Sequence, residues 1–163
     1  KETIDHIFAS PFVRTVETAH AVAHHLGVPL KLEWGLCEWL NPDWMPSMPE
    51  TLPLDFLAQE FPRVDRAYQS RVRPTYPETE AQMRDRCART ARILADEFPG
   101  NLLFVGHGAS VLGTAHALAG TNVTIRAALC CLVQLRDRGD GWIVELAGDT
   151  SHLSSTEGQV RFR

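Results

Sequence analysis

The stretch 101–110, NLLFVGHGAS, combines residue types from which binding and catalytic sites are often built. Its apolar first half predicts a strand buried on both faces, as in a parallel sheet. Gly106, His107 and Gly108 predict a sharp turn, and Ala109 opens a segment with helical apolar spacing. A turn from strand into helix leaves backbone N–H groups at the helix start, which favours a bound anion. The pattern predicts an anion site at the C-terminal edge of a sheet, although a turn histidine without chemistry fits these residues equally well.

Arg14 and Glu38 follow two other predicted strands. The guanidinium of Arg14, in the first turn of a helix, could bind a phosphate through two hydrogen bonds. Glu38 stands beside Trp39, and a carboxyl group against an aromatic ring loses solvation, which favours the protonated form that a general acid needs. Each residue alone more often is an ordinary surface side chain. Together with His107, they predict one crevice for phosphoryl transfer or phosphate-ester hydrolysis.

The elements that would position these side chains alternate between strand and helix. The predicted strands are 5–10, 28–34, 102–105, 129–136 and 142–146, and the predicted helices are 11–26, 54–61, 79–98 and 109–119. This alternation predicts an α/β fold with three layers, in which helices flank a mostly parallel sheet and an edge hairpin lies near the C-terminus. At this length the simplest organisation is one domain over residues 1–163. The polar tail from 148 onward is expected to lie along the surface.

Local signals predict how several elements begin. Ser10 is the expected N-cap of the first long helix. Thr79 and Gln82 have the spacing of a capping box at the start of the helix 79–98. Cys130 and Cys131 are adjacent in a strand-like run, so we expect their side chains to point to opposite faces of a strand.

The segment 35–53 differs from the rest, because Trp and Met alternate with Pro and Asn. It has too many prolines for regular structure and too many apolar residues for a solvated linker. We expect an ordered insertion that covers the site, with a plain surface loop as the alternative. Trp39 and Trp44, with Trp34 nearby, suggest an apolar or aromatic leaving group.

Composition excludes several classes of protein. The apolar fraction of 44% suffices for a core, and the net charge of −4 argues against a nucleic-acid or anionic-membrane surface. No apolar run approaches the roughly 20 residues that a membrane-spanning helix needs. The four cysteines lack a C-x-x-C spacing and are expected to be reduced thiols, which favours a cytoplasmic location.

Two other kinds of site are disfavoured. His20 and His24 lie four residues apart on one predicted helix, but no third ligand follows at a recognisable spacing, so no metal site is predicted. A serine hydrolase would carry its nucleophile where Gly108 stands, and Ser110 comes two residues late.

Three motifs resemble the histidine phosphatase superfamily, the phosphoglycerate-mutase-like proteins. They are IFASPFVRTVETAH at 7–20, GLCEW at 35–39 and FVGHGAS at 104–110. The first is long and is similar to that family's second phosphate-arginine segment. The second, with the Trp- and Pro-rich insertion, is most similar to the phosphatase domain of the ubiquitin-associated and SH3-containing regulators of T-cell signalling and to the ecdysteroid-phosphate phosphatases.

The resemblance implies a hydrolase for phosphate monoesters that acts through a phosphohistidine, with no metal or cofactor. It implies that Arg14 binds the phosphoryl group, that Glu38 donates a proton to the leaving oxygen and that His107 stabilises the transferring group. Gly108 and Ala109 would complete the substrate-binding set. The implied partner is a phosphorylated small molecule or phosphoprotein, and a homodimer stays open.

The family's nucleophile is a histidine in an R-H-G motif at the end of the first strand, and this sequence contains no Arg-His pair. We expect that an N-terminal segment is missing and that this polypeptide is inactive alone. The physical reason is that loss of a central strand would expose the apolar edge of the strand 102–105. One alternative is a natural pseudo-phosphatase that keeps a phosphate-binding site as an interaction module. A mutase-type phosphotransferase is less favoured, because no second basic cluster is recognisable.

Overall fold

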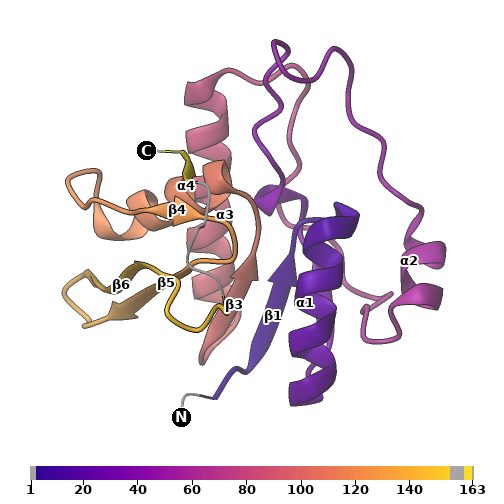
Figure 1. The fold of residues 1–163 in the computed structure, drawn as a ribbon, viewed down its shortest axis with the longest axis horizontal. Helices are drawn as coiled ribbons and strands as arrows, with labels where there is room; N and C mark the ends of the chain where they lie inside the picture. The colour runs from indigo at the N-terminus through magenta and orange to yellow at the C-terminus, as the bar shows by residue number, and fades with distance from the viewer. Residues whose placement is uncertain (1–2, 155–159, 163) are drawn as a thin grey trace.

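The computed structural model describes residues 3–154 and 160–162. A three-stranded sheet lies at its centre, with β1 (His6–Ala9) between β2 (Leu30–Leu32) and β3 (Leu102–Val105). β1 pairs in parallel with both neighbours. Because parallel strands end at the same edge of a sheet, the segments that follow the three strands begin side by side (Figure 1).

Helices cover both faces of this sheet (Figure 1). They are α1 (Val13–Leu26), α2 (Leu54–Glu60), α3 (Glu80–Glu97) and α4 (Gly108–Ala119). Successive residues of a strand point to opposite faces. Accordingly, Ile7 packs with residues of α1 and α2, whereas Phe8 packs with Leu94 of α3. Helix α4 packs against α3. The predicted three-layer α/β fold is confirmed.

Helix α1 does not begin as predicted. Its N-cap residue is Phe12, and no side chain caps the helix. Ser10 lies two residues earlier, fully buried, and the prediction that it is the N-cap is wrong. The physical reason is that the Ser10 hydroxyl contacts a side chain from another element, described below. The helix ends as predicted at Gly27, whose φ of 73° is a left-handed conformation that glycine adopts without strain.

Helix α3 begins with the predicted capping box. The Gln82 backbone N–H donates to the Thr79 hydroxyl, and the Thr79 N–H donates to the Gln82 side chain. One face of the helix is buried, and it carries Met83, Arg86, Cys87, Thr90, Ala91 and Leu94. An arginine in this apolar stripe was not predicted, and its contacts bear on the site.

The predicted hairpin near the C-terminus is present as β5 (Leu132–Asp137) and β6 (Trp142–Asp149), which pair antiparallel. Within the described ranges it forms its own two-stranded sheet and is not an edge of the central one. Cys130 and Cys131 precede β5 in a turn, with Cys130 at φ 54°. The prediction that they alternate along a strand is wrong, because this φ breaks the extended backbone.

Part of the predicted polar tail is a strand. β7 (Val160–Phe162) pairs antiparallel with β4 (Ala127–Ala128), so these three tail residues form a strand. The expectation for 155–159 lies outside the described residues. No helix in the described ranges has both the length and the apolar character needed to cross a membrane.

The capping box on α3 can be tested by Thr79→Ala. The substitution removes the hydroxyl that accepts from the Gln82 N–H, and we expect the free energy of unfolding to fall by about 1 kcal/mol in urea denaturation. Thr18→Ala is the matched control, because Thr18 is exposed within α1 and its hydroxyl only donates to the Arg14 carbonyl one turn earlier. Equal losses in both variants would contradict a capping role.

Candidate functional site

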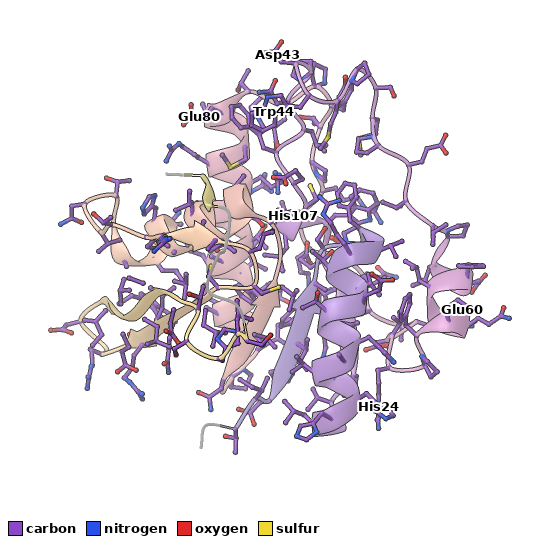
Figure 2. All side chains as sticks on the ribbon, in the orientation of Figure 1. His24, Asp43, Trp44, Glu60, Glu80 and His107 are labelled. Carbon is purple, nitrogen blue, oxygen red and sulfur yellow. The ribbon has the colours of Figure 1, made fainter. Side chains whose placement is uncertain are left out.

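Backbone hydrogen bonds join the ends of the three central strands. The Ser10 N–H donates to the Val105 carbonyl at 3.0 Å, and the Glu33 N–H donates to the Ala9 carbonyl at 2.8 Å. The segments that leave β1, β2 and β3 are therefore fixed to one another at one edge of the sheet. Figure 2 shows His107 at this edge, where α1 and α4 begin.

The structure brings together the three side chains that the sequence singled out. Arg14 Nη2 lies 2.9 Å from His107 Nδ1. Glu38 Oε2 lies 3.8 Å from Arg14 Nη2 and 3.6 Å from His107 Nδ1. The exposed fraction of the side chain is 59% for Arg14, 15% for Glu38 and 3% for His107. The His107 imidazole thus lies at the buried end of the site, and the Arg14 guanidinium lies at its solvent-exposed end.

The protonation state of His107 follows from its partners. A guanidinium only donates hydrogen bonds, so Nδ1 must accept from Arg14 and carries no proton. The ring proton is then on Nε2, which donates to the Ser10 hydroxyl at 2.9 Å. Ser10 therefore holds the ring from below, a role that the sequence did not reveal because the residue also suits an N-cap.

Burial, together with the smaller effect of the positive charges of Arg14 and Arg86, lowers the pKa of His107 from its usual 6.5 to about 3. The imidazole is consequently neutral at neutral pH. Its 3.6 Å approach to Glu38 is therefore not an ion pair, whereas the Arg14 guanidinium brings a positive charge to within 3.8 Å of the Glu38 carboxyl group.

The start of α4 adds backbone donors. His107 is the N-cap residue, and its own N–H donates to the Ser110 hydroxyl at 2.8 Å. Gly108 and Ala109 are the first helical residues, and N–H groups at such positions have no partner within the helix. Together with the helix dipole and Arg14, they favour a negatively charged ligand.

Close packing explains the glycine before His107. A Cβ on Gly106 would collide with the Ser110 hydroxyl and would lie 3.1 Å from the Leu36 carbonyl. The turn that carries His107 is thus pressed against the short helix η1 (Trp34–Leu36), which leads to Glu38. A side chain at position 106 would separate the two.

The Trp- and Pro-rich segment lies beside the site. The Trp39 side chain packs with Ala109 at the start of α4 and with Met83 of α3. Trp44 makes an edge-to-face contact with Trp39 at 5.2 Å between ring centroids and is 54% exposed. The part of the predicted insertion that contains Trp39 and Trp44 is therefore anchored next to the predicted anion site.

Arg86 is a further residue of the site region that the sequence analysis missed. It lies on α3, is 3% exposed and donates hydrogen bonds to the Gly35, Cys37 and Glu38 carbonyls. Its position among buried residues spaced three and four apart was an available signal, because a charged residue in an apolar stripe requires a buried partner.

Among the described residues, no group of three or more His, Cys, Asp or Glu side chains is arranged to hold a metal ion. The arrangement instead unites a guanidinium, a neutral imidazole and a helix N-terminus with one carboxyl group. Such a set can bind an oxyanion and can place a proton donor beside it.

Comparison with known proteins gives a consistent family. Residues 1–150 match the family model of the histidine phosphatase superfamily, branch 1. The transcription factor tau 55 kDa subunit of Saccharomyces cerevisiae is 33% identical over 121 residues, an alignment that covers 69% of this chain. It covers 28% of the yeast protein, so the chain spans less than a third of that relative.

A solved structure agrees with the fold. The ecdysone phosphate phosphatase from Bombix mori, crystallised in complex with tungstate, superposes with a TM-score of 0.76 at 24% identity. The match covers 95% of this chain and 67% of that one. At this level of identity the likeness establishes a shared fold.

The state of His107 gives a prediction about pH. The unfolded chain titrates this imidazole near 6.5 and the folded chain near 3, so the unfolded state binds more protons between these values. The contribution of His107 to stability is therefore complete above pH 6.5 and is lost as the pH falls toward 3. We expect the wild-type free energy of unfolding to decrease more steeply over this range than that of His107→Gln.

The exposed His152 provides the control, because His152→Gln is expected to keep the wild-type slope. Nitrogen-15 NMR of the ring at pH 7 should show a neutral imidazole with its proton on Nε2. A protonated ring at pH 7, or the same slope in His107→Gln as in wild type, would contradict this assignment.

Proposed function

The chain belongs to branch 1 of the histidine phosphatase superfamily, and from this premise we propose that its site binds the phosphoryl group of a phosphate monoester. The observation that carries the proposal is the 2.9 Å contact between Arg14 and the buried His107 at the start of α4. Three features that favour an oxyanion meet there, namely a guanidinium, an imidazole and a helix N-terminus.

In the reaction that we propose for this site when a nucleophilic histidine is supplied to it, a phosphate monoester is hydrolysed through a phosphohistidine. Arg14 binds the phosphoryl oxygens with its planar fork of N–H donors, and the N–H groups of Gly108 and Ala109 add to the binding. His107 stabilises the charge of the transferring group once its Nδ1 has acquired a proton. Glu38 donates a proton to the leaving oxygen, for which its position between Arg14 and His107 is suited.

The nucleophile is the part of this reaction that the 163 residues do not supply. The sequence has no Arg-His pair, and His107 is the described histidine that contacts Arg14. Among the others, His6 begins β1 at the opposite edge of the sheet, and His116 lies in the last turn of α4. We therefore propose that this polypeptide binds a phosphoryl group without forming a phosphohistidine.

A second candidate function is a phosphate-recognition module without turnover. One observation favours it, since the yeast relative at 33% identity is named as a transcription factor subunit. The same Arg14 and His107 contacts would serve this function. In both candidates the proposed partner is a phosphorylated small molecule or phosphoprotein in the cytoplasm, and the two candidates differ in chemistry and not in binding.

Binding can be measured with tungstate or orthophosphate by isothermal titration calorimetry. Hydrogen bonds to a charged group contribute about 1.5–3 kcal/mol, so Arg14→Ala should weaken the affinity by about ten- to a hundredfold. Arg63→Ala is the matched control, because the partly buried Arg63 side chain donates to the Gly27 carbonyl at the far end of α1. An absence of binding, or equal losses in both variants, would contradict the proposal.

Chemistry can be measured on the same polypeptide with p-nitrophenyl phosphate. We expect no release of p-nitrophenol and no acid-labile phosphoenzyme, because among the described residues His107 is the histidine in contact with Arg14 and the sequence has no Arg-His pair. Tungstate binding in the same preparation shows that the site is folded. Detection of a phosphohistidine on these 163 residues would refute this part of the proposal.

A further inference from the structure

Every N–H group of the Arg86 guanidinium has a hydrogen-bond acceptor within the protein. The side chain lies on α3 and only 4% of its surface is exposed. Two of its N–H groups donate to the two carboxylate oxygens of Glu78, at 2.7 and 2.8 Å. Its other donors reach the backbone carbonyls of Gly35 at 2.8 Å, Cys37 at 3.1 Å and Glu38 at 3.2 Å. A guanidinium has five N–H donors, and all five have an acceptor here.

Glu78, the partner of Arg86, is hydrogen-bonded to the residues that follow Glu38. Its carbonyl accepts from the Trp39 indole N–H at 2.8 Å. Its N–H donates to the Leu40 carbonyl at 3.0 Å, and its carboxylate accepts from the Leu40 N–H at 3.4 Å. Arg86 thus holds the backbone up to Glu38, and Glu78 holds the backbone directly after it.

Helix α3 also presses directly on the backbone of the turn before Glu38. A Cβ on Gly35 would collide with the Thr90 side chain, one turn along α3 from Arg86. The glycine therefore allows the turn to lie against the helix at the distance that the Arg86 hydrogen bonds require. The carboxyl group of Glu38 leaves this fixed backbone toward Arg14 and His107.

We infer that Arg86, paired with Glu78, is a positioning residue that holds the Glu38 carboxyl group against Arg14 and His107. The inference rests on the proposed function, because it assigns a purpose to the placement of the proposed proton donor. A lysine could not take over this role, since an ammonium has three donors and no planar fork. A merely structural ion pair would stabilise the domain without affecting what Glu38 does at the site.

The test uses the charge of Glu38 as a reporter of its position. At a pH at which the proposed proton donor has lost its proton, the Glu38 carboxylate repels a bound oxyanion, so Glu38→Gln should tighten tungstate binding measured there by about three- to tenfold. If Arg86 positions Glu38, this gain requires an intact Arg86. In the Arg86→Lys background we expect Glu38→Gln to change the affinity by less than about twofold, because the carboxyl group is no longer held at the site.

Arg84→Lys is the matched control on the same helix. Arg84 is exposed, and its guanidinium pairs with Glu80, one turn earlier on the same helix, at an N···O distance of 2.7 Å. The gain from Glu38→Gln should persist in that background. A gain of the same size in the Arg86→Lys background would overturn the inference.

Should Arg86→Lys fail to fold, the double substitution Glu78→Leu with Arg86→Met removes the ion pair without leaving a buried charge unpaired. In this double variant, too, we expect Glu38→Gln to change the affinity for tungstate by less than about twofold. A wild-type gain in this double variant would overturn the inference.

A crystal structure of either variant decides the positioning independently of anion binding. We expect the Glu38 carboxyl group to leave the 3.8 Å contact with Arg14 that it makes in the wild-type protein. An unmoved carboxyl group would overturn the inference even if tungstate binds. If the wild-type protein binds no tungstate, the proposed function fails, whereas this comparison still supports or overturns the role of Arg86.

Discussion

The parallel pairing of β1 with both of its neighbours is the constraint from which the site follows. In this register Ala9 lies level with Leu32 on one side and with Val105 on the other. The chain therefore leaves three strands at the same height and on the same edge of the sheet. Arg14, Glu38 and His107 come from segments far apart in the sequence, and this register explains why they meet. Antiparallel pairing would send at least one of them to the opposite edge.

Helix α3 makes further contacts that hold these segments in place. It touches both segments that carry the site, since Arg86 binds the turn before Glu38 and Cys87 packs where a Cβ on Gly113 of α4 would lie. A buried guanidinium is tolerated there because its charge is matched by Glu78 and each N–H has an acceptor. Burial of the ring lowers the pKa of His107 and keeps it neutral, and the positive charges of Arg14 and Arg86 add to this effect. The buried pair of Arg86 and Glu78 is thus connected to the site through the backbone of the turn before Glu38.

Sequence patterns predicted those features that depend on local chemistry or on periodicity. The apolar run 102–105 followed by Gly-His-Gly predicted the strand, the turn and the helix, and the Thr79 capping box predicted the start of α3. The patterns could not show whether the Ser10 hydroxyl caps a helix or binds a distant side chain. Ser10 precedes a helix and suits a cap, yet only the fold shows that His107, 97 residues later, takes that hydroxyl as its partner. The positive φ of Cys130 was equally hidden, because a cysteine at that conformation has no sequence signature.

The hydrogen bonds at the site show why binding of a phosphoryl group and its transfer have different requirements. Arg14 donates to a neutral imidazole nitrogen, and an ionised phosphoryl oxygen is a stronger acceptor, so the guanidinium gains by exchanging one for the other. Nδ1 of His107 can then face the ligand as a donor only if it acquires a proton. The Ser10 hydroxyl tolerates that change, since a hydroxyl can accept from Nε2 or donate to it. Binding thus needs groups that this chain has, whereas transfer through a phosphohistidine also needs a nucleophilic histidine, and the sequence contains no Arg-His pair. This is why one geometry suits both a hydrolase and a recognition module, and why affinity alone does not distinguish them.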